Sequence, residues 1–153
     1  MPETVSGVPL HPLVVHAVVV LIPLAALGVF AIAVIAKWRY RYGGLVAVVA
    51  VVAAALVPVA VLSGRALKDL LGSNDDIDRH QQIAQTLLFT AFPLAILAIL
   101  LWLIGRRTER GVATARGLVI LVATLGVVFA LGVGVQVVLI GHSGANAAWS
   151  TSP

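Results

Sequence analysis

Residues 13–36 read LVVHAVVVLIPLAALGVFAIAVIA, and this stretch decides the fold class. It contains no Asp, Glu, Lys or Arg, and as an α-helix it would cross the ~30 Å hydrocarbon core of a bilayer. Similar apolar runs follow at about 43–62, 83–104 and 117–140. Each run is apolar on every side and lacks the alternation of a membrane β-barrel strand, so we predict four transmembrane helices.

The composition agrees with a membrane protein. Hydrophobic residues make up 61% of the 153 residues and charged residues only 10%, whereas about a quarter of the residues in soluble domains are charged. Four spans use most of this length, so we expect a single domain over residues 1–153. The predicted fold is all-α, an integral membrane four-helix bundle with a short outer C-terminal tail. Its helices are expected at about 11–36, 43–62, 75–105 and 117–141.

A short amphipathic segment separates the second and third runs. Residues 65–71 read RALKDLL, which places Leu67, Leu70 and Leu71 on one face of a helix. A single apolar face suits a helix that lies in the membrane interface. We therefore predict a short interfacial helix between helices two and three, which ends at Gly72.

The charged residues indicate the orientation of the chain. Basic residues gather in the first and third connections between the apolar runs: Lys37, Arg39, Arg41, Arg106, Arg107, Arg110 and Arg116. Positively charged loops of membrane proteins face the cytoplasm, so we expect both termini and the middle connection, 63–82, to lie outside. The net charge of +4 follows from this topology and does not indicate nucleic-acid binding.

Several kinds of chemistry are excluded by the residues that the chain lacks. There is no cysteine, and the only methionine is Met1. Disulfides, thiolate metal sites, iron–sulfur ligation and a methionine axial ligand within the membrane are therefore excluded. No GxSxG, HExxH, Walker or dinucleotide-binding motif is present. We expect a non-catalytic or electron-transfer subunit rather than a stand-alone enzyme.

The four histidines, His11, His16, His80 and His142, are the candidate functional residues because all of them map to the outer half of the bundle. Two imidazoles from different helices at similar depth can supply the two axial ligands of haem b. We take His16 and His80 as the first pair of ligands, and His142 as a replacement for either one. Arg65 and Arg79 lie on the same side and can neutralise the haem propionates.

Other interpretations of these polar residues remain open. Three histidines with an aspartate of the middle connection would bind zinc or copper, and the histidines also suit a structural role or a proton relay. His11 and His16 are five residues apart, about 140° around a helix, so they cannot bind one metal from one regular helix face. Gln85 and Gln136 are either interhelical hydrogen-bonding residues or contacts for a quinone head group.

Both ends of the sequence resemble a known bacterial family, catalogued as domain of unknown function 2231. The resemblance covers nearly the whole chain and rests on His11, Pro12, His16, His80, Gly141, His142 and Gly144, followed by Trp149. It implies four spans in the bacterial cytoplasmic membrane. Ala17 stands here where the family commonly has an aromatic residue and a proline. Members are often joined to a Rieske domain or encoded near redox proteins, which implies a role in electron transfer.

These observations lead to one functional hypothesis and one alternative. The hypothesis is a membrane electron-transfer subunit that binds haem b and passes electrons between a quinol or membrane dehydrogenase and an outside acceptor. Rieske or other redox membrane subunits are its expected partners, besides the lipid bilayer. The alternative is a cofactor-free accessory or anchoring subunit of a larger membrane complex. It would pack through small-residue helix faces such as Gly126, Ala130 and Gly134.

Overall fold

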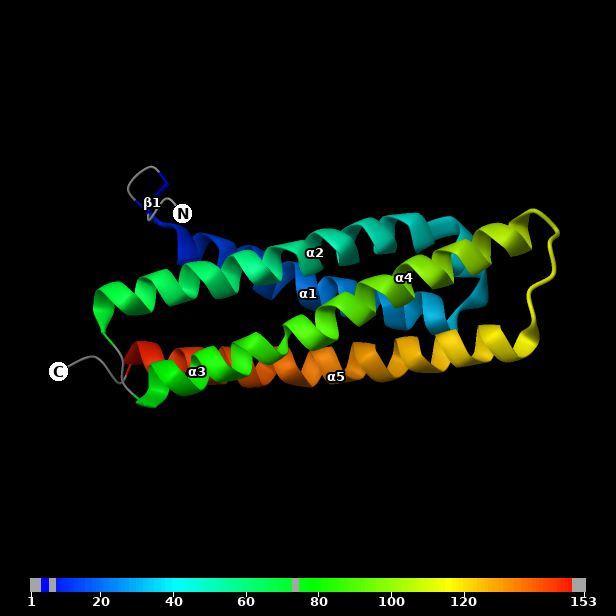
Figure 1. Ribbon diagram of the computed structural model, residues 1–153. Helices are drawn as coiled ribbons and strands as arrows, with labels where there is room; N and C mark the ends of the chain where they lie inside the picture. Colours follow the sequence, from blue (N-terminus) through cyan, green and yellow to red (C-terminus); the bar gives the residue numbers. More distant parts are fainter. Residues whose placement is uncertain (1–3, 6–7, 73–74, 150–153) are drawn as a thin grey trace.

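Four helical rods run side by side in the computed structural model, which describes residues 4–5, 8–72 and 75–149 (Figure 1). The helices are α1 (Leu10–Val34), α2 (Ala36–Leu71), α3 (Asp75–Thr86), α4 (Leu88–Glu109) and α5 (Arg116–Trp149). α3 and α4 together form the third rod. A two-stranded antiparallel ribbon of β1 (Thr4–Val5) and β2 (Val8–Pro9) precedes α1.

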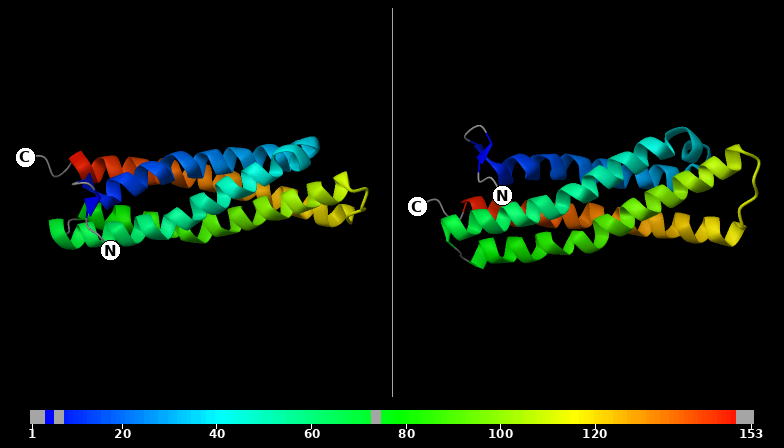
Figure 2. Two further views of the ribbon diagram at one scale, coloured as in Figure 1. Left: turned by 90° about the horizontal axis from the view of Figure 1, so that it is seen from above. Right: turned by 45° about the horizontal axis from the view of Figure 1, so that its top comes forward.

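The four rods enclose one hydrophobic core. α1 packs against α2 and α5, and α4 packs against the same two helices, so α1 and α4 lie opposite each other across the bundle (Figure 2). Buried alanine, valine, leucine and isoleucine side chains from all four rods form the core. Gly126 and Ala130 of the predicted small-residue ladder face this core, and Gly126 lies against Leu101, Ala33 and Val29. These small residues let α5 approach its neighbours closely.

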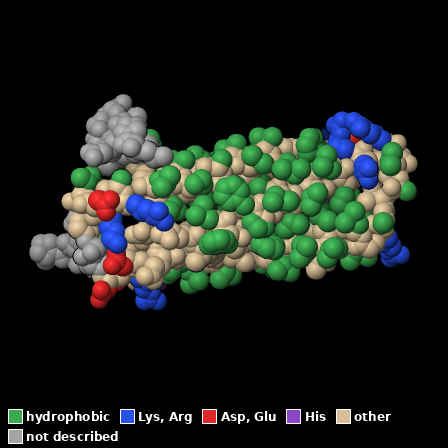
Figure 3. All heavy atoms as spheres, viewed as in Figure 1, with side chains coloured by type: hydrophobic (Ala, Val, Ile, Leu, Met, Phe, Trp, Pro, Cys, Tyr) green, Lys and Arg blue, Asp and Glu red, His purple; other side chains and the backbone are tan. Residues whose placement is uncertain are grey.

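The two ends of the bundle differ in their polar residues. α1 and α3 begin, and α2 and α5 end, at what we call the histidine end, which contains His11, His16, His80 and His142 (Figure 1). The α1–α2 and α4–α5 connections form the opposite end, which we call the arginine end. Between the two ends, the face in Figure 3 is covered mainly by hydrophobic side chains. This distribution is typical of a protein that crosses a bilayer.

Each rod contains a segment that is long and apolar enough to span a membrane. The candidate spans are His11–Val34, Ala36–Leu70, Asp75–Glu109 and Arg116–Asn146. Many large hydrophobic side chains on these rods are exposed, which suits contact with lipid. The structure thus confirms the predicted all-α fold with four potential transmembrane helices.

The separate interfacial helix predicted over residues 65–71 is not confirmed. These residues form the last two turns of α2, which ends where the backbone N–H of Gly72 donates to the Lys68 carbonyl. No proline interrupts residues 59–71, so the helix continues past the apolar run. α5 likewise extends beyond its predicted end at residue 141, through most of the expected C-terminal tail. The last four residues of that tail, 150–153, lie outside the described residues.

The third rod forms one candidate span over Asp75–Glu109, which includes the predicted helix at 75–105, with a one-residue break in the regular helix at Leu87. Gln136 of α5 lies beside this break and contacts both of its sides. Its amide Nε2 donates to the Thr86 hydroxyl, and its Oε1 accepts from the Thr90 hydroxyl, each over 2.5 Å. Both polar ends of the Gln136 amide are therefore used in holding α3 and α4 to α5, which is the interhelical role that its sequence position allowed.

At the arginine end, Arg39 closes the α1–α2 connection. Its guanidinium is buried and donates from Nε to the Ile32 carbonyl (2.8 Å) and from Nη2 to the Ala33 carbonyl (2.6 Å). Both carbonyls belong to the last turn of α1, where they have no partner within the helix. A positive charge at this position also complements the helix dipole. Arg39 is thus a helix cap as well as one of the positive charges that predict topology.

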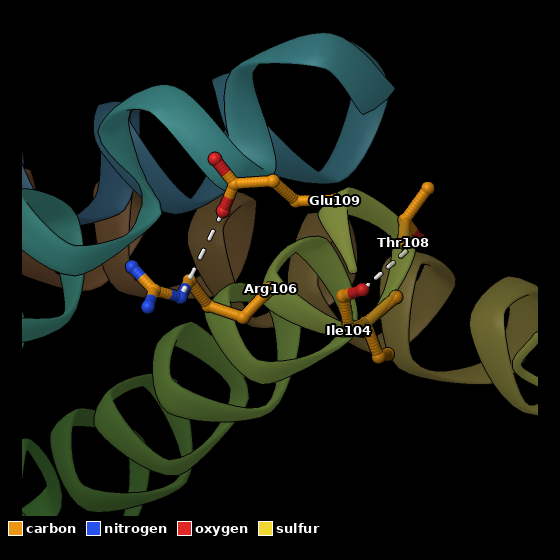
Figure 4. Close-up of polar contacts among 4 residues, drawn as sticks. All are labelled: Ile104, Arg106, Thr108 and Glu109. Atoms are coloured by element: carbon orange, nitrogen blue, oxygen red, sulfur yellow. Dashed lines mark hydrogen bonds and ion pairs between the residues drawn. The ribbon is translucent and has the colours of Figure 1, made fainter. Parts of the chain in front are cut away.

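The end of α4 packs unusually close to the start of α2. A Cβ atom built on Gly105 would lie 2.6 Å from the carbonyl carbon of Arg39 and 2.7 Å from the backbone nitrogen of Tyr40. Only glycine permits this approach. Beyond it, the Thr108 hydroxyl donates back to the Ile104 carbonyl over 3.0 Å (Figure 4). The same view shows the exposed ion pair of Arg106 and Glu109, 3.8 Å apart, which closes the last turn of α4.

Candidate functional site

The packing of α1 decides which of its two histidines faces the interior. His11 precedes the buried Val14 by three residues and Val18 by seven, so it lies on the buried face of the helix. His16 lies three residues after the exposed Leu13 and four before the exposed Val20, on the outward face. His11 is therefore half-buried, and His16 is exposed.

Two polar groups of α2, the Ala60 carbonyl and the Ser63 hydroxyl, hold the His11 ring. Its Nδ1 lies 3.1 Å from the Ala60 carbonyl oxygen and 3.2 Å from Ser63 Oγ. Ser63 is buried and donates its own proton to the Ala60 carbonyl over 3.1 Å. Both atoms facing the ring are thus acceptors, so Nδ1 must carry the proton in the neutral ring. The other ring nitrogen, Nε2, is left with an unshared electron pair.

His80 repeats this arrangement on the other side of the bundle. Its Nδ1 lies 3.0 Å from Ser143 Oγ on α5. Ser143 is buried and donates to the Ile140 carbonyl over 2.9 Å. With the Ser143 proton directed to Ile140, the Ser143 oxygen is free to accept from His80 Nδ1, and this assignment leaves Nε2 unprotonated.

A glycine beside each serine makes room for the imidazole. A Cβ atom at Gly64 would lie 2.9 Å from His11 Cε1, and a Cβ atom at Gly144 would lie 3.1 Å from His80 Cε1. Both distances are shorter than ordinary van der Waals contact. Each ring therefore lies directly against the backbone of a neighbouring helix, and a side chain at either glycine would displace it.

The two half-buried rings form what we call the histidine pair, His11 and His80. They come from α1 and α3, and they are close enough for an electrostatic interaction between them. The rod that contains α3 lies opposite α1, so the two imidazoles belong to opposite rods of the bundle. This arrangement can offer one unprotonated Nε2 from each side to a shared ligand.

The other predicted site residues lie outside this pair. His16 donates from Nδ1 to the Pro12 carbonyl of its own helix over 2.6 Å. His142, Arg65 and Arg79 are exposed at the histidine end. The structure thus brings His11 close to His80, and it places His16, chosen from the sequence as the partner of His80, on the outer surface.

Two further polar features lie at this end. Lys68 Nζ and Asp78 Oδ1 are 2.5 Å apart and join the end of α2 to α3. Gln81 Oε1 is buried and has no hydrogen-bond partner among the described residues. Within this part of the chain, no group of three or more His, Asp or Glu residues converges as a metal cluster would require.

Sequence reasoning missed the roles of Ser63, Gly64 and Ser143, and gave Gly144 only as part of a family motif. One signal was available, because the dipeptide Ser-Gly occurs near the ends of both the second and the fourth apolar runs. A serine on the inner face of an apolar helix requires a hydrogen-bond partner, and a histidine is a suitable one.

Comparison with known proteins identifies the family. The pattern of one protein family, described as predicted membrane protein (DUF2231), matches residues 7–152, which is nearly the whole chain. No curated protein and no solved structure matches the chain significantly. With its four candidate spans and a family match over nearly its whole length, the chain belongs to the membrane protein family of domain of unknown function 2231.

Proposed function

We propose that this protein is a membrane electron-transfer subunit that binds haem b between His11 and His80. The observation that carries the proposal is the histidine pair itself, two imidazoles from opposite rods with Nδ1 engaged and Nε2 unprotonated. Histidines that ligate metals usually donate the other ring N–H to a carbonyl or another acceptor, which fixes the ring and its tautomer. Haem b would supply reversible one-electron transfer at this site.

The donor set fits this cofactor in two respects. Both ligands are neutral imidazoles, which suits a b-type haem with two axial histidines. Arg65 and Arg79 are exposed at the same end, where guanidinium groups would bind the propionates.

The proposal changes one ligand of the pair predicted from the sequence. His16 is exposed on the outward face of α1, so the half-buried His11 replaces it opposite His80. His142 is exposed and remains a surface residue in this scheme. A quinol or a membrane dehydrogenase would donate electrons, and a Rieske protein or another outside protein would accept them.

The test is a reduced-minus-oxidised absorption spectrum of the protein purified in mild detergent, with iron measured in the same sample. We expect a haem b spectrum with close to one iron per chain. His11→Ala and His80→Ala should each lose most of the haem, since either change removes one axial ligand. His16→Ala and His142→Ala are matched controls that should retain it.

Two results would contradict the proposal. If His11→Ala and His80→Ala keep their full haem content, the ligand assignment is wrong. If the native protein contains no iron and does not bind added hemin, the electron-transfer function itself is rejected.

A cofactor-free accessory subunit is the second candidate, and the surface of α5 favours it. Gly132, Gly134 and Gly141 have no neighbouring atom within 4 Å of a Cβ built on them. Open glycines on a transmembrane helix allow close approach by a helix of another subunit. Copurification of a stoichiometric membrane partner with a colourless protein would support this second function.

For the sidedness, we propose that the arginine end faces the bacterial cytoplasm and that both termini lie outside. The support is the excess of Lys and Arg at the arginine end. A reporter fused at the C-terminus should then read external, and one inserted beside Arg107 should read cytoplasmic. Reversed readings would overturn this orientation.

A further inference from the structure

The contacts of His11 and His80 match in their serine and glycine partners. In each, a histidine near the start of a rod donates to a buried serine near the end of the next rod, and its ring lies on the following glycine. In each, the serine hydroxyl donates to the carbonyl three residues earlier. We call each set a His–Ser–Gly unit: His11 with Ser63-Gly64, and His80 with Ser143-Gly144.

The buried faces of the two rods that carry the histidines are also the same, counted from each histidine. The positions 7, 11, 14, 15, 18 and 21 residues after the histidine are buried in both rods. After His11 these are Val18, Ile22, Ala25, Ala26, Val29 and Ile32; after His80 they are Leu87, Ala91, Leu94, Ala95, Ala98 and Leu101. The residue types at these positions differ. The two rods therefore share a pattern of buried positions and not an amino-acid sequence.

The two rods that carry the serines match in the same way. The residues 13 and 10 positions before the serine are buried in both: Ala50 and Ala53 on α2, and Ala130 and Val133 on α5. Ser63 follows the first residue of α2 by 27 positions, and Ser143 follows the first residue of α5 by 27 positions. The two serines therefore lie at equal heights along their helices, measured from the arginine end.

The arrangement of the four rods also has an approximate two-fold symmetry. α1 with α2 forms one helical hairpin, and the α3–α4 rod with α5 forms a second hairpin that runs in the same direction (Figure 1). α1 lies opposite α4, and α1 and α4 each pack against both α2 and α5. A half-turn about the long axis of the bundle thus exchanges the two hairpins. The histidine pair is exchanged by the same half-turn.

We propose that the chain consists of two copies of one helical hairpin, and that their His–Ser–Gly units are the two halves of a single binding site on the two-fold axis. In each half, the serine and the glycine hold the imidazole ring. The unprotonated Nε2 of each ring then binds one metal-containing ligand that the two halves share. Ser63, Gly64, Ser143 and Gly144 are positioning residues, because they act on the ligand through the imidazoles. Only the identity of the ligand, haem b, rests on the proposed function.

The first experiment tests the site without any ligand. The protein, labelled with ¹⁵N-histidine in detergent micelles, is examined by long-range ¹H–¹⁵N correlation at a pH where the rings are neutral. We expect both His11 and His80 to carry the proton on Nδ1, with assignments from His→Gln variants. Ser63→Ala should shift the His11 nitrogens alone, and Ser143→Ala the His80 nitrogens alone, by similar amounts. A proton on Nε2 in either ring, or a serine variant that leaves its ring unchanged, would overturn the proposal.

The second experiment tests whether the halves share one ligand, with hemin as the probe. Gly64→Ala and Gly144→Ala should each weaken hemin binding at least tenfold and to a similar extent, since a methyl group at either position displaces one ring. Gly141→Ala is the matched control, because its Cβ meets open space. One hemin should bind per chain, and His11→Ala/His80→Ala should bind no more weakly than the worse single variant.

The outcomes separate this inference from the proposed function. Hemin binding that fails in the native protein, while both rings keep the proton on Nδ1, rejects the haem function and leaves the two-fold site intact. Two hemins per chain, or a loss confined to one glycine variant, rejects the shared two-fold site even if the protein contains haem.

Discussion

The arginine end and the histidine end of this bundle join the same helices by different means. At the arginine end, α2 and α4 approach until a Cβ atom at Gly105 would overlap the backbone of Arg39 and Tyr40. The buried Arg39 at this end donates hydrogen bonds to two backbone carbonyls of α1. At the histidine end, the helices are linked through two imidazoles that each leave one ring nitrogen unused.

The comparison separates groups that maintain the fold from groups that are available for function. The polar atoms of Arg39 for which contacts are described all serve the backbone of the same chain, so its role is complete without a ligand. The histidine pair holds unused electron pairs in a half-buried position, which stability alone does not require. Substitutions at the two ends should therefore differ in what they damage.

Gly105→Ala should have the largest effect on stability. The added methyl group would meet backbone atoms, which cannot rotate away, so we expect a loss of about 3 kcal/mol or more in the free energy of unfolding. Unfolding in mixed micelles with increasing SDS would measure it. Gly134→Ala is the control, since its Cβ meets nothing within 4 Å, and it should change stability by less than about 1 kcal/mol. Equal stabilities of the two variants would show that the two helices are not in contact at Gly105.

Arg39→Leu should have an intermediate effect. It removes two hydrogen bonds from a charged donor and leaves two carbonyls of the last turn of α1 without their partner, at a cost of about 2 kcal/mol. Arg41→Leu removes an exposed guanidinium that lies 5.7 Å from the centre of the Tyr42 ring, and it should cost much less. The same SDS titration compares them. An Arg39→Leu variant as stable as the Arg41→Leu variant would refute the capping role.

Gln136→Leu should have the smallest effect of the three. Interhelical hydrogen bonds in membrane proteins contribute about 0.6 kcal/mol on average, so the loss of the bonds to Thr86 and Thr90 should cost about 1 kcal/mol. Hydrogen exchange should increase around Leu87, where α3 and α4 meet, and the affinity for added hemin should stay the same as in the native protein. Gln82→Leu, at an exposed position, is the control. Weaker hemin binding in Gln136→Leu alone would extend the functional region beyond the histidine pair.

Most of the fold could be predicted from the sequence, because long apolar runs have few alternatives in a membrane. The ends of the helices were harder to place. Residues 63–71 are polar enough to leave the bilayer yet remain helical, so α2 continues where hydropathy suggested a new element. The division at Leu87 has no proline or glycine beside it to predict it, and it is held by a glutamine some 50 residues away in the sequence.

The candidate site could be located at one end of the bundle, but its members could not all be identified. α1 is apolar on every side, so hydropathy does not distinguish the face with His11 from the face with His16. Residue size would have been a better guide. Leu24 and Leu27 lie on the exposed face, and Ala25 and Ala26 lie on the buried face. Small side chains mark the helix faces that pack in membranes.

The equal heights of Ser63 and Ser143 have a consequence for energy conversion. Each serine lies 27 residues from the start of its helix, or about 40 Å at 1.5 Å per residue. The hydrocarbon core is only ~30 Å thick, so a bilayer whose inner boundary lies near the start of these helices would place the histidine pair at the level of the head groups on the other side. Electrons that enter and leave a cofactor there would cross almost none of the membrane's electric field. Such a reaction would neither build nor consume a membrane potential, and a water-soluble carrier could reach it directly.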